Sequence, residues 1–84
     1  SIMESRMRKS ELPPMVKELG NRILQLIKAK GLKPREVAHS ADLDIENLRK
    51  YIKGSQEMKI STLVRIATAL DVPIHELFNF YEKK

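Results

Sequence analysis

The chain of 84 residues has no cysteine and no tryptophan, and only four of its residues are aromatic. The lack of cysteine excludes a disulfide framework and a thiolate metal site. No apolar run approaches the ~18 residues that suggest a membrane-spanning helix, so we expect a soluble protein of the cytoplasm. The fold must be held together by packing alone.

The apolar content is sufficient for a folded core. Leucine, isoleucine, valine and phenylalanine together number 24 of the 84 residues, a share above that of disordered chains. A chain of this length supports one small domain, which buries only a little over ~60% of the surface that its unfolded form exposes. We therefore expect a single compact core.

Positive charge is in excess and unevenly distributed. The net charge is +5 and the isoelectric point is about 9.7. The whole excess lies in residues 1–33, whereas residues 34–59 and 60–84 each sum to zero. A basic segment favours an anionic partner such as nucleic acid. Charge of this kind supplies affinity without sequence information.

Apolar spacing predicts an arm followed by a helix. Residues 1–12 show no apolar period and are interpreted as a flexible N-terminal arm, with the domain at 13–84. Apolar residues then recur at steps of three and four, which indicates a helix that runs to about Lys30 and is stopped by Gly31. The members of this apolar face are Val16, Leu19, Ile23, Leu26 and Ile27.

Two short helices are predicted next. The second helix begins near Pro34 and ends at Asp42. The third occupies residues 45–53, between an N-cap at Asp44 and a C-cap at Gly54.

A fourth helix is predicted to start with Ser61 as its cap, and a fifth to start around Pro73. No stretch alternates between apolar and polar residues with period two, so no strand is predicted. The expected fold class is all-α, with five helices.

Only three residues, Asp42-Leu43-Asp44, connect the second and third helices. So short a connection forces the helices to cross steeply, as in a helix-turn-helix. Val37 and Ala41 must then pack inward, and Ala38 must be small because the third helix crosses there. Asp42 must turn the chain, and we expect it at positive φ.

Several positional demands are met together over about residues 15–80. The residues that meet them are Leu19-Gly20-Asn21-Arg22-Ile23, Lys30-Gly31-Leu32, Val37-Ala38, Leu43, Leu48, Tyr51, Gly54, Leu63, Ile66-Ala67, Leu70 and Leu77-Phe78. In these residues the sequence resembles the lambda-repressor-like, Cro-type (xenobiotic response element) helix-turn-helix family. The resemblance implies a five-helix domain of a bacterial or phage transcription regulator that binds double-stranded DNA as a dimer.

The sequence departs from this family at three places. Asp42 stands where the family usually has glycine, and Pro34 where it usually has a glutamine that reaches a phosphate. Ile27 and Ile52 stand where the family often has an arginine and a glutamate that form a partly buried ion pair. Because both members of the pair are apolar here, we expect Ile27 to pack on Ile52.

The resemblance implies that the third helix reads DNA, with reading positions at Asp44, Ile45, Glu46, Arg49 and Lys50. Lys50 is the first choice for guanine O6 and N7, and Arg49 is the second. Glu46 is suited to accept from cytosine N4. Ile45 is suited either to a thymine methyl group or to the core, and Asp44 fits an N-cap better than a base contact.

Phosphate contacts are expected around the reading helix. Lys53 is placed near the DNA backbone by the resemblance, and Arg35 and Lys59 are further candidates. Asn47 is a secondary candidate for a base or a phosphate.

Plainer interpretations remain for the same residues. The polar face of the third helix could be a solvated surface with a pair between Glu46 and Lys50. His39 and His75 have no companion ligands, so neither a metal nor another cofactor is expected. No nucleophile–base pair, paired carboxylates or phosphate-binding glycine loop indicates an enzyme.

Phe80 and Tyr81 fall partly outside the apolar face of the last helix. They favour a homodimer contact through this C-terminal helix, a truncated continuation into another segment, or a cover for the edge of the core. We expect sequence-specific binding of double-stranded DNA in the cytoplasm, on the nucleoid when bound. The alternative is a protein-interaction module on the same scaffold, such as an antitoxin-like or assembly partner.

Overall fold

The computed structural model describes residues 12–80, which form four α-helices and one short 3₁₀ helix. In chain order these elements are α2 (Pro14–Ala29), α3 (Pro34–Ser40), α4 (Ile45–Lys53), α5 (Ile60–Leu70) and η1 (Ile74–Phe78). No strand occurs between residues 12 and 80. The all-α prediction is thus confirmed for this range, while the predicted arm, apart from Leu12, lies outside the described residues.

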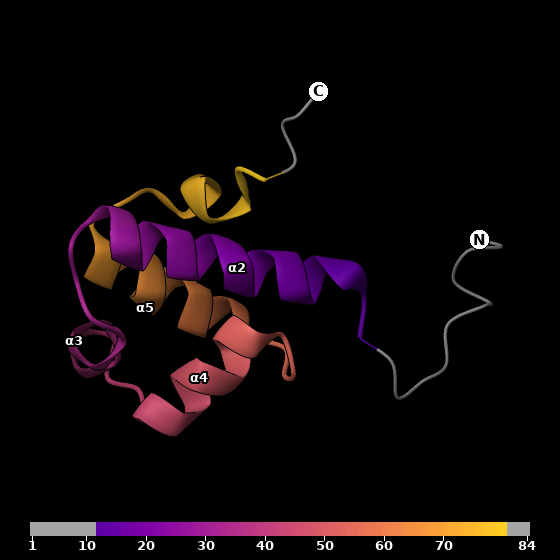
Figure 1. The fold of residues 1–84 in the computed structure, drawn as a ribbon, viewed down its shortest axis with the longest axis horizontal. Coiled ribbons are helices and arrows are strands. Elements are labelled where there is room, and N and C mark those ends of the chain that lie inside the picture. The colour runs from indigo at the N-terminus through magenta and orange to yellow at the C-terminus, as the bar shows by residue number, and fades with distance from the viewer. Residues whose placement is uncertain (1–11, 81–84) are drawn as a thin grey trace, which may run out of the picture.

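The longest helix, α2, crosses the whole molecule and organises the others around it (Figure 1). It packs against α3, α4 and η1, and α5 in turn packs against α3 and η1. In Figure 1, η1 lies on one side of α2, whereas α4 lies on the opposite side. The predicted end of α2 is confirmed, because Lys30 is its C-cap and Gly31 follows at a φ of 70°.

A single apolar core lies between these helices. Its largest fully buried side chains come from all five elements and are Ile23, Ile27, Val37, Leu48, Ile66, Leu70 and Leu77. Among the described residues, no buried side-chain nitrogen or oxygen lacks a hydrogen-bond partner. The core is therefore formed by apolar packing, as the absence of cysteine requires.

The close approach of α2 to α4 depends on glycine, which has no side chain. A Cβ atom at Gly20 would overlap the backbone carbonyl oxygens of Tyr51 and Ile52. At the end of α4, Gly54 has a φ of 77°, and a Cβ there would lie 2.6 Å from the Cα of Lys17. Two glycines thus let the backbones of α2 and α4 approach closely, which fixes the position of α4.

One predicted helix start needs correction. The fourth helix begins at Ile60 with Lys59 as its N-cap, so Ser61 lies inside the first turn and is not the cap. The extended backbone of Lys59 is the physical reason, because its carbonyl oxygen already accepts from the amides of Thr62 and Leu63 at 3.0 and 3.1 Å.

The predicted fifth helix is a 3₁₀ helix of five residues, Ile74–Phe78, with Pro73 as its N-cap. Within this helix the carbonyl oxygen of Glu76 accepts two hydrogen bonds, one from the side chain of Arg22 and one from the amide of Asn79. The tighter 3₁₀ geometry is typical of so short a segment.

The expected packing of Ile27 on Ile52 remains a prediction. Ile27 is buried in the core, and Ile52 is half-buried and packs against the same cluster. This placement of the two side chains is compatible with a direct contact.

Candidate nucleic-acid interface

The connection between α3 and α4 has the geometry that a helix-turn-helix needs. Asp42 has a φ of 59°, which confirms the predicted left-handed turn, and the amide of Leu43 donates to the carbonyl of Ala38 at 2.8 Å. Ala38 and Ala41 are each 2% exposed. Small side chains at these positions allow α4 to cross close to α3.

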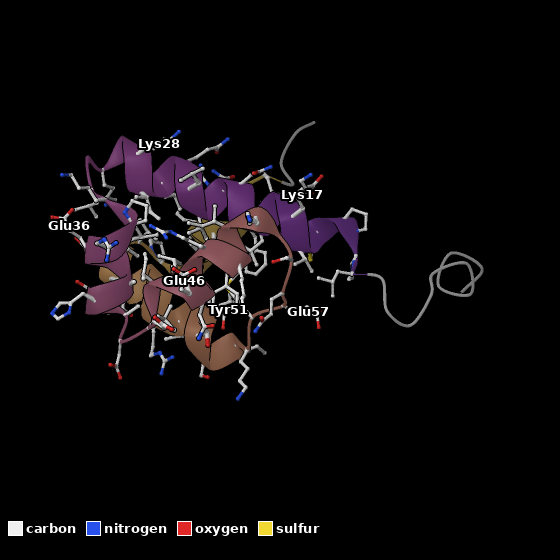
Figure 2. The ribbon with its side chains drawn as sticks, turned by 60° about the horizontal axis from the view of Figure 1, so that its bottom comes forward. Lys17, Lys28, Glu36, Glu46, Tyr51 and Glu57 are labelled. Atoms are coloured by element: carbon white, nitrogen blue, oxygen red, sulfur yellow. The ribbon has the colours of Figure 1, made fainter. Side chains whose placement is uncertain are left out.

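The two faces of α4 differ in burial. Leu48 and Tyr51 are buried in the core. The opposite face carries four exposed charged residues: Glu46, Arg49, Lys50 and Lys53. Figure 2 brings α4 to the front of the molecule, with Glu46 and Tyr51 labelled on it. The structure therefore places four of the predicted DNA-contacting residues on one exposed face, and we call these four residues the charged face of α4.

One ion pair lies within this face. Arg49 Nη1 is 3.4 Å from Glu46 Oε2, and both side chains are more than half exposed. The sequence interpretation had considered a pair between Glu46 and Lys50 instead. Within residues 12–80, neither Lys50 nor Lys53 has an acidic partner. Exposed pairs of this kind stabilise proteins by only ~0–1 kcal/mol, so Arg49 can leave Glu46 at little cost.

The start of α4 is held by the fold rather than by a side-chain cap. Asp44 is the N-cap residue, as predicted, but its exposed carboxylate makes no capping hydrogen bond. Ile45 is half-buried and packs against the core. Asn47 is also half-buried. Ile45 thus serves the core, which was one of its two predicted roles, and retains a partly exposed surface.

The remaining predicted residues lie on neighbouring elements. Arg35 is exposed in the first turn of α3, and Lys59 is exposed at the N-cap of α5. The start of α3 is fixed by the amide of Lys33, which donates to Glu36 Oε1 at 2.8 Å. Pro34 follows as the first residue of the helix. Neither Arg35 nor Lys59 belongs to α4 or to its charged face.

A groove runs along the charged face of α4 and was not expected from the sequence. It has a volume of about 400 Å³ and is lined by Leu24, Pro34, Glu46, Arg49, Lys50, Ile52 and Lys53. Leu24, Pro34 and Ile52 are lining residues that the sequence had not assigned to a functional site, and Leu24 had been given no role at all. The sequence offered one indication of this role: Leu24 is an apolar residue of the first helix that lies outside the predicted buried face.

Residues 12–80 contain neither a candidate metal site nor a candidate membrane-spanning helix. No cluster of three or more histidine, cysteine, aspartate or glutamate residues could hold a metal ion there. No helix in the same range combines the length and hydropathy needed to cross a membrane.

Known proteins share both the sequence pattern and the fold. The family model of the Cro/C1-type HTH DNA-binding domain matches residues 22–83. Two uncharacterized HTH-type transcriptional regulators, from Rickettsia conorii and Rickettsia prowazekii, are each 35% identical over 65 residues, or 77% of this chain. The chain spans about half the length of these relatives, 52% and 50% respectively.

Solved structures of other proteins have a similar fold. The restriction-modification controller protein C.AhdI from Aeromonas hydrophila is 30% identical, with a TM-score of 0.73 and coverage of 75% of this chain and 96% of that one. The clp gene regulator ClgR from C. glutamicum has the same fold, with a TM-score of 0.75 over 80% of this chain and 87% of that one, at 21% identity.

Fold and site together define a helical DNA-binding domain with a helix-turn-helix. The chain belongs to the Cro/C1-type HTH DNA-binding family, as its resemblance to the lambda-repressor-like proteins implied. This is a family of DNA-binding domains and not of enzymes.

Proposed function

We propose that this protein is a transcriptional regulator that reads double-stranded DNA sequence-specifically with α4 in the major groove. The observation that carries the proposal is the charged face of α4, which is exposed on the second helix of a helix-turn-helix. The Rickettsia relatives are described as transcriptional regulators, which supports the same role for this chain. Its place of action would be the cytoplasm, on the nucleoid when bound.

Lys50 is the proposed principal base reader. Its ammonium group is exposed and has no acidic partner within residues 12–80, so it can approach guanine O6 and N7 without first breaking an ion pair. Arg49 is the second candidate for guanine, and Glu46 can accept from cytosine N4 once the weak Arg49–Glu46 pair opens. Each good contact of this kind contributes roughly 1–3 kcal/mol of discrimination.

The first turn of α4 supplies secondary contacts in this proposal. The partly exposed surface of Ile45 can lie against a thymine methyl group while the rest of the side chain packs on the core. Asn47 can reach a base or a phosphate. Asp44 occupies a reading position of the family, but its carboxylate accepts and cannot donate, which limits it to the amino groups of bases.

Phosphate contacts would set the depth of α4 in the groove. The candidates are three exposed cations: Lys53 at the end of the charged face, Arg35 in the first turn of α3, and Lys59 at the N-cap of α5. Such contacts position a protein on the duplex but carry no sequence information. Pro34 has no side-chain donor, so the phosphate contact that the family makes with glutamine is absent here.

A homodimer would place two copies of α4 in successive major grooves. Half-sites of a near-palindromic operator would then lie ~34 Å apart, one helical turn. We propose that the C-terminal segment with Phe80 and Tyr81 takes part in the dimer contact. Phe80 is half-buried and its ring centroid is 6.3 Å from that of Phe78, so only part of Phe80 can contact a second copy. Tyr81 lies outside the described residues.

The alternative is a protein-interaction module on the same scaffold. It is favoured by the exposed carboxylates of Asp44 and Glu46 at the reading end of α4, because these repel phosphate. Binding of random duplex DNA at low salt separates the two functions. DNA reading predicts measurable affinity that falls as salt is added, whereas no affinity at low salt would contradict it and leave the interaction module.

A further inference from the structure

The groove along α4 has an apolar floor. Leu24 from α2, Pro34 from α3 and Ile52 from α4 line it, and all three are half-buried. Its volume of about 400 Å³ lies within the usual range of sites for small molecules, ~300–1,000 Å³. Three helices thus form an apolar surface that is large enough for an acyl chain or an aromatic ring.

The rim of the same groove is cationic. It carries Arg49, Lys50 and Lys53 against a single carboxylate, that of Glu46. Because Glu46 pairs with Arg49 at 3.4 Å, the two lysines contribute the uncompensated positive charge. An apolar floor beside two ammonium groups that have no acidic partner in the described part of the chain is complementary to a molecule with an apolar body and one anionic group.

We propose that this groove binds a small amphipathic anion, whose apolar body lies on Leu24, Pro34 and Ile52 and whose carboxylate or phosphate faces Lys50 and Lys53. The groove is open to solvent along one side, so the affinity is modest. Occupancy would take the two lysines away from DNA, and the ligand would act as an inducer. This last step rests on the proposed reading role of α4, but binding of the anion does not.

The binding test uses octanoate below its micelle concentration and amide chemical shifts of the labelled protein. We expect shifts that concentrate at residues 24, 46, 49, 50, 52 and 53. Octyl phosphate should act in the same way, which tests whether the anionic group can be either oxyanion. Octylammonium, which has the same chain and the opposite charge, and acetate, which has no chain, should have at least tenfold weaker effects.

Two variants test the two halves of the groove. Leu24→Glu places a carboxylate in the floor and should weaken octanoate binding at least tenfold. Lys53→Gln removes one charge from the rim without changing the core, and it should also weaken octanoate binding. It replaces Leu24→Glu as the test if that variant does not fold. Lys28→Gln removes the same charge on the exposed surface of α2, outside the groove, and should leave binding unchanged.

Three results would overturn the proposal: no shifts at the groove, equal shifts with octylammonium, or unchanged octanoate affinity in both groove variants. The same holds if DNA, but not octanoate, shifts the groove residues, because the groove would then be part of the DNA footprint.

The competition test is separate. Saturating octanoate should lower the affinity for duplex DNA at least fivefold, and undiminished DNA binding would contradict the inducer role. A protein that binds octanoate but no DNA in its absence would contradict the proposed function and leave the anion site intact.

Discussion

Arg22 and Glu76 lie 54 positions apart in the chain and are joined by two hydrogen bonds. Arg22 Nε donates to the backbone carbonyl of Glu76 at 2.9 Å, and Nη2 donates to its Oε1 at 2.8 Å. The two side chains are only 19% and 35% exposed. Charge-assisted bonds from one guanidinium to both a carbonyl and a carboxylate therefore hold η1 against α2, where Leu77 enters the core.

Replacing Arg22 should destabilise the fold. We expect Arg22→Ala to lower the free energy of unfolding by about 1–3 kcal/mol, because two charge-assisted bonds in a partly buried place are lost. Urea denaturation with a double-mutant cycle against Glu76→Ala measures the coupling. The exposed Arg49–Glu46 pair is the matched control, with an expected coupling of at most ~0.5 kcal/mol. Equal coupling in both pairs would contradict this role of Arg22.

Adding a single methyl group at Gly20 should be costly. Gly20→Ala places a Cβ on the carbonyl oxygens of Tyr51 and Ile52, so α4 must move away from α2. We expect a loss of about 2–4 kcal/mol in the free energy of unfolding, at the upper end of overpacked sites or above it, because the added Cβ meets backbone atoms and not a flexible side chain. Chemical denaturation provides the measurement.

Gly31→Ala is the control for this change. A Cβ at Gly31 would meet no atom within 4 Å, so the cost there comes only from its φ of 70° and should be about 1–2 kcal/mol. A smaller loss at Gly20 than at Gly31 would show that α4 tolerates the displacement.

A glutamate at position 52 tests the packing expected between Ile27 and Ile52. Ile52→Glu places a carboxylate against a buried apolar side chain, so we expect a loss of about 2–4 kcal/mol. The double variant Ile27→Arg with Ile52→Glu should recover part of this loss, because an ion pair replaces the unpaired charge. Thermal and urea unfolding of the three variants give the coupling.

Ile60→Glu provides the matched control, because Ile60 is 75% exposed and its replacement should change stability by less than ~0.5 kcal/mol. If Ile52→Glu were as neutral as Ile60→Glu, the two isoleucines would not pack together.

The features that could be predicted from the sequence are those determined by residues close together in the chain. Asp42 and Gly54 were assigned to turns because few other residues tolerate positive φ, and both have it. The residues of the charged face of α4 came from the family resemblance, and their helical spacing agrees with a shared face. Ser61 was mistaken for a cap because the extended backbone of Lys59, set by the preceding loop, determines where α5 begins.

Contacts between segments that are distant in the chain could not be predicted from the sequence. Arg22 is one of the residues that carry the family resemblance, but nothing near it in the sequence indicates a partner 54 positions away. The same limit applies to the groove, which requires Leu24, Pro34 and Ile52 to come together from three helices. The family resemblance supplied the candidate reading positions but not the partner of Glu46, since both position 49 and position 50 are within its reach.

DNA affinity should depend steeply on salt. About four phosphate contacts per subunit predict a slope of log affinity against log salt of about −7 for a dimer. Lys59→Gln should reduce the magnitude of the slope by about 2, because a dimer loses two contacts. Fluorescence anisotropy with one duplex over a range of salt concentrations measures both slopes. An unchanged slope would remove Lys59 from the phosphate contacts.

The central claim is that α4 reads base sequence, and selection of duplexes from a random pool tests it most directly. Wild-type protein and Lys50→Ala are compared, with Lys28→Ala as a control for the loss of one exposed charge. The proposed function predicts a near-palindromic motif for wild type and Lys28→Ala, with relaxed preference in each half-site for Lys50→Ala. The same motif with undiminished preference in Lys50→Ala would contradict the assignment of Lys50, and no motif for wild type would contradict sequence-specific reading by α4.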